Sequence, residues 1–342
     1  MRCLLRSLLL QTLACALLSA VVQAAESKSL QIFFIDVEGG QATLMVTPSG
    51  QSLLIDTGWP GFNGRDASRI VAAAKTAGVD RIDYVVITHF HRDHVGGVTQ
   101  LASQIKIGTF VDHGPNMEDA AAPREDFAAY EKVAAHSKRV VLKPGDQIPM
   151  KDIGVQVLTA AGEHISTPLP GAGQPNPLCA AEPEAAVDST ENARSLGTLT
   201  TFGQFHFLDL GDLTKRKERD LACPKNLIGT VDLYLTTHHG LNQSNAKVIV
   251  DAVHPRVSIM NNGAHKGGSP DAWETIHNSP GLQDLWQLHY AMDSDKAHNV
   301  SEMFIANPDE NCEGKYIKVT AETNGAFTVL NSRNNYKKTY SK

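Results

Sequence analysis

Residues 88–97 read THFHRDHVGG, and this stretch decides what kind of fold the chain adopts. It follows the apolar run IDYVVI, which is typical of a buried strand. Imidazole and carboxylate groups are the usual ligands of zinc and related divalent ions. In an extended segment His89 and His91 point the same way, while Asp93 and His94 turn toward a neighbouring position. We therefore expect two adjacent ligand sets that two cations share, and two following glycines that let the backbone turn sharply past the metals.

The remaining ligands are expected at the ends of other apolar strands. Asp212 in FLDLGDL is the preferred bridging carboxylate, because an apolar strand delivers it to a Gly-Asp turn, and Asp209 within the strand is the weaker choice. LYLTTHHG supplies His238 and His239, one of which should complete the second metal site. The parallel between DYVVITHF and DLYLTTHH favours His238, whereas the adjacent glycine gives His239 more freedom. Both stay candidates.

Other polar residues are placed to support such a site. Asp56 in LLIDTG lies at another strand end, where it could accept a hydrogen bond from a ligand histidine. The alternative is an aspartate that only shapes the turn before a glycine. His265 and Lys266 in NNGAHKGGSP precede the start of a helix and could hold an anionic leaving group, with a plain glycine turn as the alternative.

Residues 1–24 have the pattern of a secretory signal peptide. Two arginines precede an apolar run at 8–22, and the small residues around Ala24 suit cleavage. The run is too short for a membrane span, and no later segment approaches roughly 18 consecutive apolar residues. We expect an exported protein, periplasmic or secreted, with no membrane span after processing.

Charge and cysteine content narrow the partners and the compartment. The chain has a net charge of −6, and removing the two arginines of the signal peptide gives −6 − 2 = −8. This charge does not favour nucleic acid as a partner, although a local basic groove is possible. Cys179, Cys223 and Cys312 remain, and an odd number in an exported protein predicts one disulfide and one free thiol.

The pattern along the chain predicts one α/β domain over residues 25–342. Residues 162–190 are polar and rich in proline, glycine and alanine without periodicity, so they are interpreted as an irregular insertion. Strands are expected at 30–37, 42–48, 51–58, 83–89, 108–114, 139–145, 154–160, 196–203, 204–212, 231–238 and 256–261, with a hairpin at 314–331. Helices are expected at 66–78, 124–139, 242–253 and from Ser269 onward.

The order of these motifs resembles the metallo-β-lactamase superfamily. HxHxDH after an apolar strand, an upstream IDTG, a downstream GD and a late histidine pair span most of the chain. Within the superfamily the chain looks like the metallo-hydrolase domain of the DNA-uptake protein ComEC, without its transmembrane helices. NARSL at 192–196 matches the Asn-x-x-Ser-Leu segment of that group, and residues 238–240 match its His-His-Gly. FIDVEGGQA keeps Asp36 and Val37 of its Asp-Val-Gly-Gln-Gly-Asp-Ala loop but departs from it at the next positions.

The resemblance implies a four-layer αββα sandwich with a two-metal site, usually zinc, along one edge. It also implies a supporting role behind the ligands for Asp36. Relatives with a β-lactamase site carry a histidine before the bridging aspartate that is missing here. Asn192 is the nearest polar candidate for a third ligand of the first metal, with His113 and His164 as alternatives. A weakly held first metal would suit Mn or Fe as well as Zn.

The predicted chemistry is hydrolysis by a hydroxide held between two divalent cations, with Asp93 or Asp212 orienting it. The ComEC-like resemblance favours a phosphodiester or a phosphorylated small molecule as substrate. One alternative is a lactonase or β-lactamase type of C–O or C–N hydrolase. Another is a non-catalytic binding protein stabilised by metal. The chain has no GxSxG or HExxH, so serine-triad and single-helix zinc chemistries are disfavoured.

Overall fold

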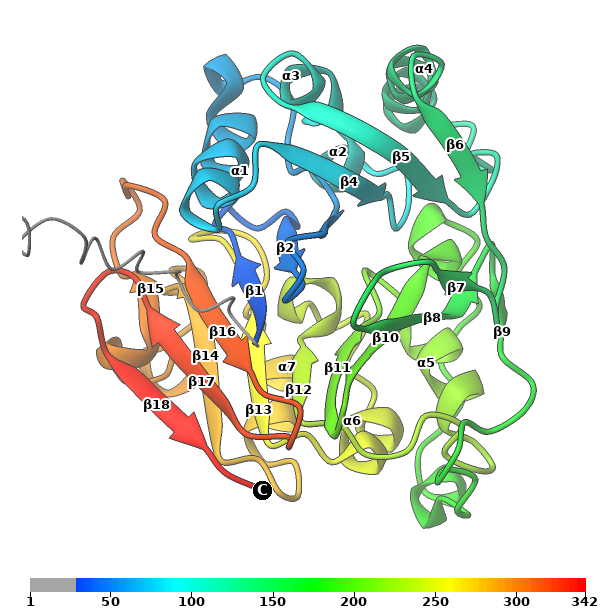
Figure 1. Cartoon of the computed structure of the whole chain (residues 1–342). Coiled ribbons are helices and arrows are strands. Elements are labelled where there is room, and N and C mark those ends of the chain that lie inside the picture. The colour runs from blue at the N-terminus through cyan, green and yellow to red at the C-terminus, as the bar shows by residue number, and fades with distance from the viewer. Residues whose placement is uncertain (1–28) are drawn as a thin grey trace, which may run out of the picture.

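The structure, a computed structural model, describes residues 29–342, so the predicted signal peptide at 1–24 lies outside the described residues. Two β-sheets of nine strands each form its centre (Figure 1). The first sheet consists of β1 (Leu30–Phe34), β2 (Thr43–Val46), β3 (Ser52–Ile55), β4 (Arg81–Val86), β5 (Lys106–Asp112), β6 (Lys138–Val141), β16 (Ile317–Ala321), β17 (Phe327–Asn331) and β18 (Lys337–Tyr340). Their order is β18-β17-β16-β1-β2-β3-β4-β5-β6.

The second sheet holds the middle of the chain. It consists of β7 (Gln147–Ile148), β8 (Gly154–Ala160), β9 (Glu163–His164), β10 (Gly197–Phe202), β11 (Phe205–Asp209), β12 (Leu233–Leu235), β13 (Val257–Met260), β14 (Asp284–His289) and β15 (Ile305–Asn307). The order is β15-β14-β13-β12-β11-β10-β8-β7, and β9 pairs with β8. The terminal hairpin expected at 314–331 is present as the antiparallel pair β16 and β17.

Seven α-helices within residues 29–342 complete the layers. They are α1 (Arg65–Thr76), α2 (Arg92–Val95), α3 (Val98–Ala102), α4 (Ala121–Ala134), α5 (Lys215–Ala222), α6 (Lys247–Val253) and α7 (Pro270–His277). The first four lie on the outer side of the first sheet, and the last three pack on the second sheet (Figure 1). The helices pack on the sheets because each has an apolar face. In α1 the residues Ala67, Ile70 and Ala74 form this buried face, while Ser68 and Lys75 are exposed.

Three separate hydrophobic clusters follow from this layering. Side chains alternate along a strand, so Ile32 and Phe34 of β1 pack against the second sheet, where Phe34 meets Phe207 edge-to-face at 5.6 Å. Phe33, between them, packs on the helix side. A third cluster fills the space between the second sheet and its helices, for example around Leu221. Helix, sheet, sheet and helix are thus four layers, and the predicted αββα fold is confirmed.

The two sheets bring the carboxyl ends of parallel strands to one region. Strands β3, β4, β5 and β6 are parallel, as are β11, β12, β13, β14 and β15. Ligand sites in open α/β sheets lie outside the carboxyl ends of such strands. The expected strands at 51–58 and 83–89 end early, at Ile55 and Val86, because their last polar residues leave the sheet.

Several elements differ from the prediction. The strand β14 and helix α5 were missed, and β14 contains the fully buried Trp286. The helix expected at 242–253 begins only at Lys247, because the preceding backbone bonds to a buried carboxylate, with Asn245 N donating to Glu218 Oε1 at 2.9 Å. No helix within residues 29–342 is long and apolar enough to cross a membrane.

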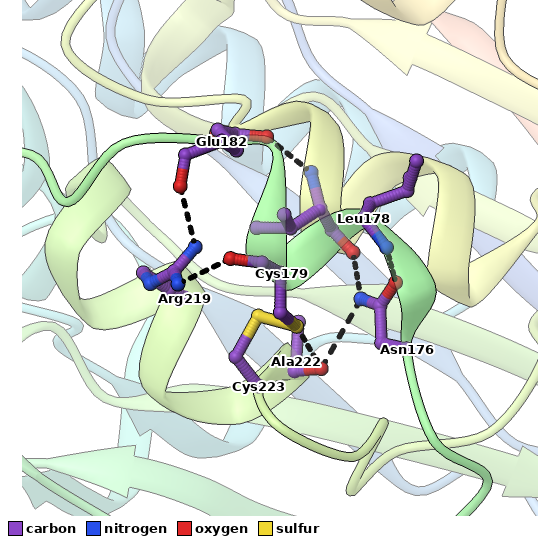
Figure 2. The surroundings of a disulfide bond; sticks show 8 residues. Asn176, Leu178, Cys179, Glu182, Arg219, Ala222 and Cys223 are labelled. Carbon is purple, nitrogen blue, oxygen red and sulfur yellow. Dashed lines mark hydrogen bonds between the residues drawn. A yellow bond between two sulfur atoms is a disulfide. The ribbon is translucent and has the colours of Figure 1, made fainter.

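A disulfide joins Cys179 to Cys223, and Cys312 has a free thiol, as the expected pair plus one free cysteine requires. Figure 2 shows that the bond attaches the segment 162–190 to the end of α5. Arg219 of that helix adds two hydrogen bonds, donating to Cys179 O at 2.7 Å and to Glu182 O at 3.1 Å. The segment itself contains β9 and one short 3-10 turn, Pro177–Ala180, and is otherwise irregular.

Candidate metal centre

Ligand-type side chains gather where β3, β4, β11 and β12 end. Asp56 follows β3, the segment 89–94 follows β4, and Asp212 lies in the turn after β11. The histidine pair lies in a 3-10 turn after β12, Thr237–Gly240, with φ of 55° at His238 and 56° at His239. Left-handed backbone is uncommon for residues with a side chain, so this turn carries local strain of the kind found at functional sites.

The hydrogen bonds of Asp56 determine the tautomer of His94. Asp56 Oδ1 accepts from Thr88 N at 2.8 Å, and Oδ2 accepts from Thr88 Oγ1 and from His94 Nδ1, both at 2.7 Å. A carboxylate accepts only, so we assign the ring proton of His94 to Nδ1. The lone pair of Nε2 then points into the centre, as expected of a metal-binding histidine held by a carboxylate.

Around that lone pair lie two carboxylates and a second imidazole. His94 Nε2 is 3.2 Å from Asp93 Oδ2 and 3.1 Å from Asp212 Oδ2. His239 Nε2 is 3.2 Å from both His94 Nε2 and Asp93 Oδ2, and 3.4 Å from Asp212 Oδ1. These four residues offer ligand atoms that all lie within 4.8 Å of one another, and all four are buried. Two carboxylates and two imidazoles at these distances form a ligand set for a divalent cation.

A second group of possible ligand atoms comes from His89 and His91. His89 Nδ1 lies 3.1 Å from Thr88 Oγ1, whose proton goes to Asp56, so the His89 Nδ1–H donates to that oxygen and leaves the Nε2 lone pair free. His91 Nε2 donates to Glu118 Oε2 at 3.0 Å, which leaves the Nδ1 lone pair free. His89 Nε2 and His91 Nδ1 lie 3.1 Å apart with no proton between them in these tautomers. The two facing lone pairs repel each other unless a cation lies near both nitrogens.

Asp212 lies between the two groups of ligand atoms. Its Oδ2 is 3.1 Å from His94 Nε2 and 3.9 Å from His89 Nε2. Its backbone N–H donates to Ser195 Oγ at 3.1 Å, which holds the turn in place. The buried Asp212 Oδ1 has no hydrogen-bond partner among the described residues. The donor set therefore fits two divalent cations that share this carboxylate.

Charge supports the same conclusion. Burial alone would raise the pKa of Asp93, but His94, Lys266 and His239 hold it well below its usual range. The pKa of Asp212 is also well below its usual range, because the surrounding imidazoles outweigh burial. The pKa of the fully buried His89 is well below its usual value, because burial and its two histidine neighbours disfavour the charged ring. Ionised carboxylates and a neutral imidazole are the protonation states that bind metal.

Part of the sequence matches a known protein family. The family described as "Metallo-beta-lactamase superfamily" matches residues 35–173, which include the HxHxDH segment and the strands β2 to β9. The predicted resemblance to the metallo-β-lactamase superfamily is thereby confirmed. Four residues of the ligand sets described above, His89, His91, Asp93 and His94, lie within the matched residues.

Individual relatives agree with this assignment. A UPF0173 metal-dependent hydrolase of Anaeromyxobacter dehalogenans is 27% identical over 261 residues, covering 74% of this chain and 82% of that protein. Another with that name, from Nitratidesulfovibrio vulgaris, is 36% identical over 88 residues, 25% of this chain and 34% of that protein. ComE operon protein 3 of Bacillus subtilis is 23% identical over 194 residues, 54% of this chain and 20% of that protein. The chain thus spans between a fifth and a third of the length of the last two relatives.

His238 and His239 take different positions in the superfamily site. His239 belongs to the four-residue ligand set, whereas His238 Nε2 reaches only Asp212 Oδ2, at 3.3 Å. His238 Nδ1 lies 3.1 Å from Ser244 Oγ. His238 also lines a cavity together with Asn192, whose buried Oδ1 has no partner among the described residues. Asn192 therefore keeps an oxygen available for a ligand role.

The other histidine candidates lie away from the ligand sets. His113 Nε2 bonds to Glu191 Oε2 at 3.0 Å, and His164 belongs to the edge strand β9. His265 is exposed and bonds to Asp293 at 2.9 Å. Lys266, its neighbour, does reach the centre: its ammonium contacts Asp93 Oδ2 directly and lies 5.0 Å from the ring centre of Trp59.

Asp36 supports a different cluster from the one expected. Its Oδ1 accepts from His289 Nε2 at 2.8 Å and its Oδ2 accepts from Arg69 Nη1 at 2.7 Å. Glu38 and Cys312 complete a second group of metal-ligating residue types. Arg69 already supplies positive charge there, and burial raises the pKa of Cys312 to about 12, so its thiol stays protonated. Hydrogen bonds join these side chains to Arg69 and to one another.

Asp209 is likewise outside the ligand sets. It accepts from Gln41 Nε2 at 2.8 Å and from Gly211 N at 3.0 Å. Burial raises its pKa to about 6. These contacts tie the turn that carries Asp212 to the loop after β1.

The glycines after HxHxDH have a different role from the one expected. Both have helical dihedrals, with φ of −63° at Gly96 and −72° at Gly97, so neither makes an unusual turn. A Cβ at Gly97 would overlap the carbonyl oxygen of Thr57, and one at Gly96 would overlap Pro60. Glycine is required because the loop after β3 packs directly against this segment, which brings Asp56 to His94.

Sequence reasoning missed two residues that orient the ligands. Glu118 holds His91 and also accepts from Glu191 N at 3.0 Å. Ser195 holds Asp212 and lies 3.5 Å from His89 Nδ1. Ser195 belongs to the matched NARSL segment, which was a usable signal. Glu118 lies in a loop with no pattern that indicates its role.

Proposed function

We propose that the protein is an exported, metal-dependent hydrolase that acts on a phosphodiester or a phosphorylated substrate. The observation that supports it most is the buried group of ligand atoms around Asp212, where the carboxylates of Asp93 and Asp212 and the imidazoles of His94 and His239 offer ligand atoms within 4.8 Å of one another. When bound, two divalent cations supply a water with a lowered pKa and positive charge for the oxygens of the substrate. Zinc is the proposed metal, with manganese or iron as alternatives.

The side chains of this chain have separable roles in that chemistry. Asp93 and Asp212 remain ionised, so each could accept a hydrogen bond from an attacking water and orient it. Asp56 fixes the ring of His94, and Glu118 fixes that of His91. Lys266 reaches the same centre from the opposite loop, and its ammonium could neutralise negative charge on a substrate oxygen.

The phosphodiester proposal rests on the likeness to ComE operon protein 3 and on the absence of a middle histidine ligand. A lactonase or β-lactamase type of hydrolase is the second candidate. Export is proposed from the pattern of residues 1–24, and the disulfide between Cys179 and Cys223 supports it, because disulfides persist in oxidising compartments.

Metal analysis and substrate comparison test these proposals together. We expect two divalent ions per chain and turnover of bis-p-nitrophenyl phosphate in preference to nitrocefin and a simple lactone. His91→Ala and Asp212→Ala should each lower turnover by roughly a hundredfold or more, because each removes a ligand. His136→Ala is the matched control, since that exposed histidine lies in the turn after α4 and belongs to neither ligand set.

Three results would count against the proposal. Turnover of nitrocefin or the lactone alone would favour the second type of hydrolase. Fewer than one metal per chain with no turnover of any substrate would favour a binding protein. Equal loss of activity in the His136 control would point to a folding effect instead of a ligand effect.

A further inference from the structure

A cavity of about 530 Å³ adjoins the metal centre. Its walls come from residues 185–190 of the irregular segment and from the first turn of α5, with His238 and Asn192 at its inner end. His238 connects it to the metal centre, because its Nε2 lies 3.3 Å from Asp212 Oδ2. The volume is in the range of pockets that hold small ligands.

The cavity wall contains hydroxyl groups without partners. The buried oxygens Thr190 Oγ1 and Thr214 Oγ1 have no hydrogen-bond partner among the described residues. Thr214 is only 7% exposed and occupies the N-cap position of α5, yet its side chain makes no capping bond. Buried hydroxyls are normally hydrogen-bonded, so a missing partner at a cavity wall indicates a ligand or ordered water.

Charge at the cavity is also unbalanced. Arg216 pairs with Glu184 of the irregular segment. Lys215, beside it, has no carboxylate oxygen within 4.0 Å of its ammonium among the described residues. Asp188 also lines the cavity, where its Oδ1 accepts from Thr190 N at 2.8 Å, so the lining contains two cations and one carboxylate. Lys215, Thr214 and Thr190 therefore line the same cavity.

We propose that this cavity binds an oxyanion of the substrate, a second anionic group next to the ester that is hydrolysed. This inference rests on the proposed function, because the cavity matters for catalysis only if the adjoining centre is hydrolytic. Lys215, Thr214 and Thr190 donate hydrogen bonds to the oxyanion, and His238 separates it from Asp212. An anion held there places the neighbouring ester at the metal centre and selects substrates with two anionic groups over those with one.

Dinucleotides test the selection. The metal-loaded protein is assayed with TpT and with its 5′-phosphorylated form, pTpT. We expect kcat/KM to be about tenfold or more higher for pTpT, the effect of one or two charge-assisted hydrogen bonds. Lys215→Met and Thr214→Val should abolish this ratio. Lys217→Met is the matched control, since it removes the same charge from the same helix but pairs with Asp220 at 3.5 Å outside the cavity.

Binding gives a readout that does not depend on turnover. Thymidine 5′-phosphate, the corresponding 5′-carboxylate and thymidine are titrated calorimetrically into the metal-loaded wild type and the three variants. We expect the Kd of the phosphate to rise about tenfold in Lys215→Met and to be unchanged in Lys217→Met. If the carboxylate binds as tightly as the phosphate, the cavity accepts oxyanions generally, which also supports the proposal.

The outcomes separate the two proposals. If no substrate is hydrolysed but nucleotide binding still depends on Lys215 and Thr214, the hydrolase proposal fails and the oxyanion cavity stands. If bis-p-nitrophenyl phosphate is hydrolysed while Lys215→Met and Thr214→Val keep the wild-type preference for pTpT and the wild-type Kd, the cavity proposal is overturned. Circular dichroism and metal content of each variant show whether a loss reflects misfolding.

Discussion

Asp56 Oδ2 and His94 Nδ1 form a 2.7 Å hydrogen bond between two fully buried side chains. This bond assigns the lone pair of His94 Nε2 to the metal centre, and Asp56 makes it from a left-handed backbone conformation with φ of 60°. The carboxylate also binds Thr88, which in turn approaches His89. One carboxylate therefore controls the ring orientation of ligands in both sets.

Replacing this carboxylate should weaken metal binding. In Asp56→Asn the amide can present a donor to His94 Nδ1 and so favour the wrong tautomer, and we expect metal affinity to fall by roughly 10- to 100-fold. Competition with a chelator of known affinity measures the change. Asp152→Asn is the control, an exposed aspartate that also has positive φ. Unchanged affinity in Asp56→Asn would show that the hydrogen bond does not set the tautomer.

The histidine pair should separate into two roles. We expect His239→Ala to lose one metal per chain, because His239 Nε2 lies within 3.4 Å of both carboxylates of the ligand set. His238→Ala should keep both metals while turnover falls, because His238 reaches only Asp212 and lines the cavity. Metal stoichiometry by mass spectrometry of the native protein distinguishes them. Loss of a metal in His238→Ala instead would identify His238 as the third ligand of the His89/His91 site.

Removing the disulfide should cost stability and affect the cavity. The bond closes a loop with a sequence separation of 44, for which the chain-entropy model gives about 4 kcal/mol of unfolding free energy. Urea unfolding of the Cys179→Ala/Cys223→Ala double variant measures this, with Cys312→Ala as a control that keeps the bond. Because the bond holds residues 182–190 near α5, we also expect KM to rise while metal content is unchanged. Equal stability of the double variant and the wild type under oxidising conditions would contradict the prediction.

Glu218 should make stability depend on pH. This buried carboxyl accepts from Asn245 N and Ala246 N, and burial raises its pKa to about 7 in the folded protein from an ordinary value of 4.5. A raised pKa means that the folded state binds the proton more tightly. The stabilisation is therefore complete below pH 4.5 and is lost as the pH rises through 7, by up to about 3 kcal/mol.

Glu218→Gln removes this titration. The unfolding free energy of the wild type minus that of the variant should decrease between about pH 4.5 and pH 8, since titrations of all other groups cancel in the difference. Glu322→Gln, at an exposed position of the β16–β17 turn, should give a difference that does not vary over this range. A flat difference for Glu218→Gln would mean that the carboxyl remains ionised when buried.

Much of the fold followed from local pattern. The apolar runs that lead into Asp56, His89 and Asp212 are strands in the structure, because a strand buried on both faces reads as a continuous apolar segment. Strand β14 was missed, since DLWQLH mixes polar and apolar residues without regular alternation. Its Gln287 and His289 are nevertheless fully buried, where Gln287 Nε2 donates to Asn299 Oδ1 at 3.2 Å and His289 Nε2 donates to Asp36 Oδ1 at 2.8 Å.

The residues that surround the ligands could not be predicted from the sequence, because contacts between distant segments bring them to their places. Glu118 meets His91 because an irregular loop after β5 folds over the ends of the strands. Asp36 lies on His289, 253 residues away in sequence, and not on a ligand histidine. The two lysines near the centre, Lys215 and Lys266, come from different segments that no sequence periodicity relates.

The sequence by itself determined the chemical types of the ligands and the strands that deliver them, because HxHxDH, IDTG and GD are short motifs whose geometry is set by neighbouring residues. Tertiary structure alone decided which of His238 and His239 joins Asp93, His94 and Asp212, because that choice depends on two successive left-handed residues packed against Gly211 and Gly268. It also decided where the cavity lies, since a disulfide and two arginines bring the irregular segment against α5.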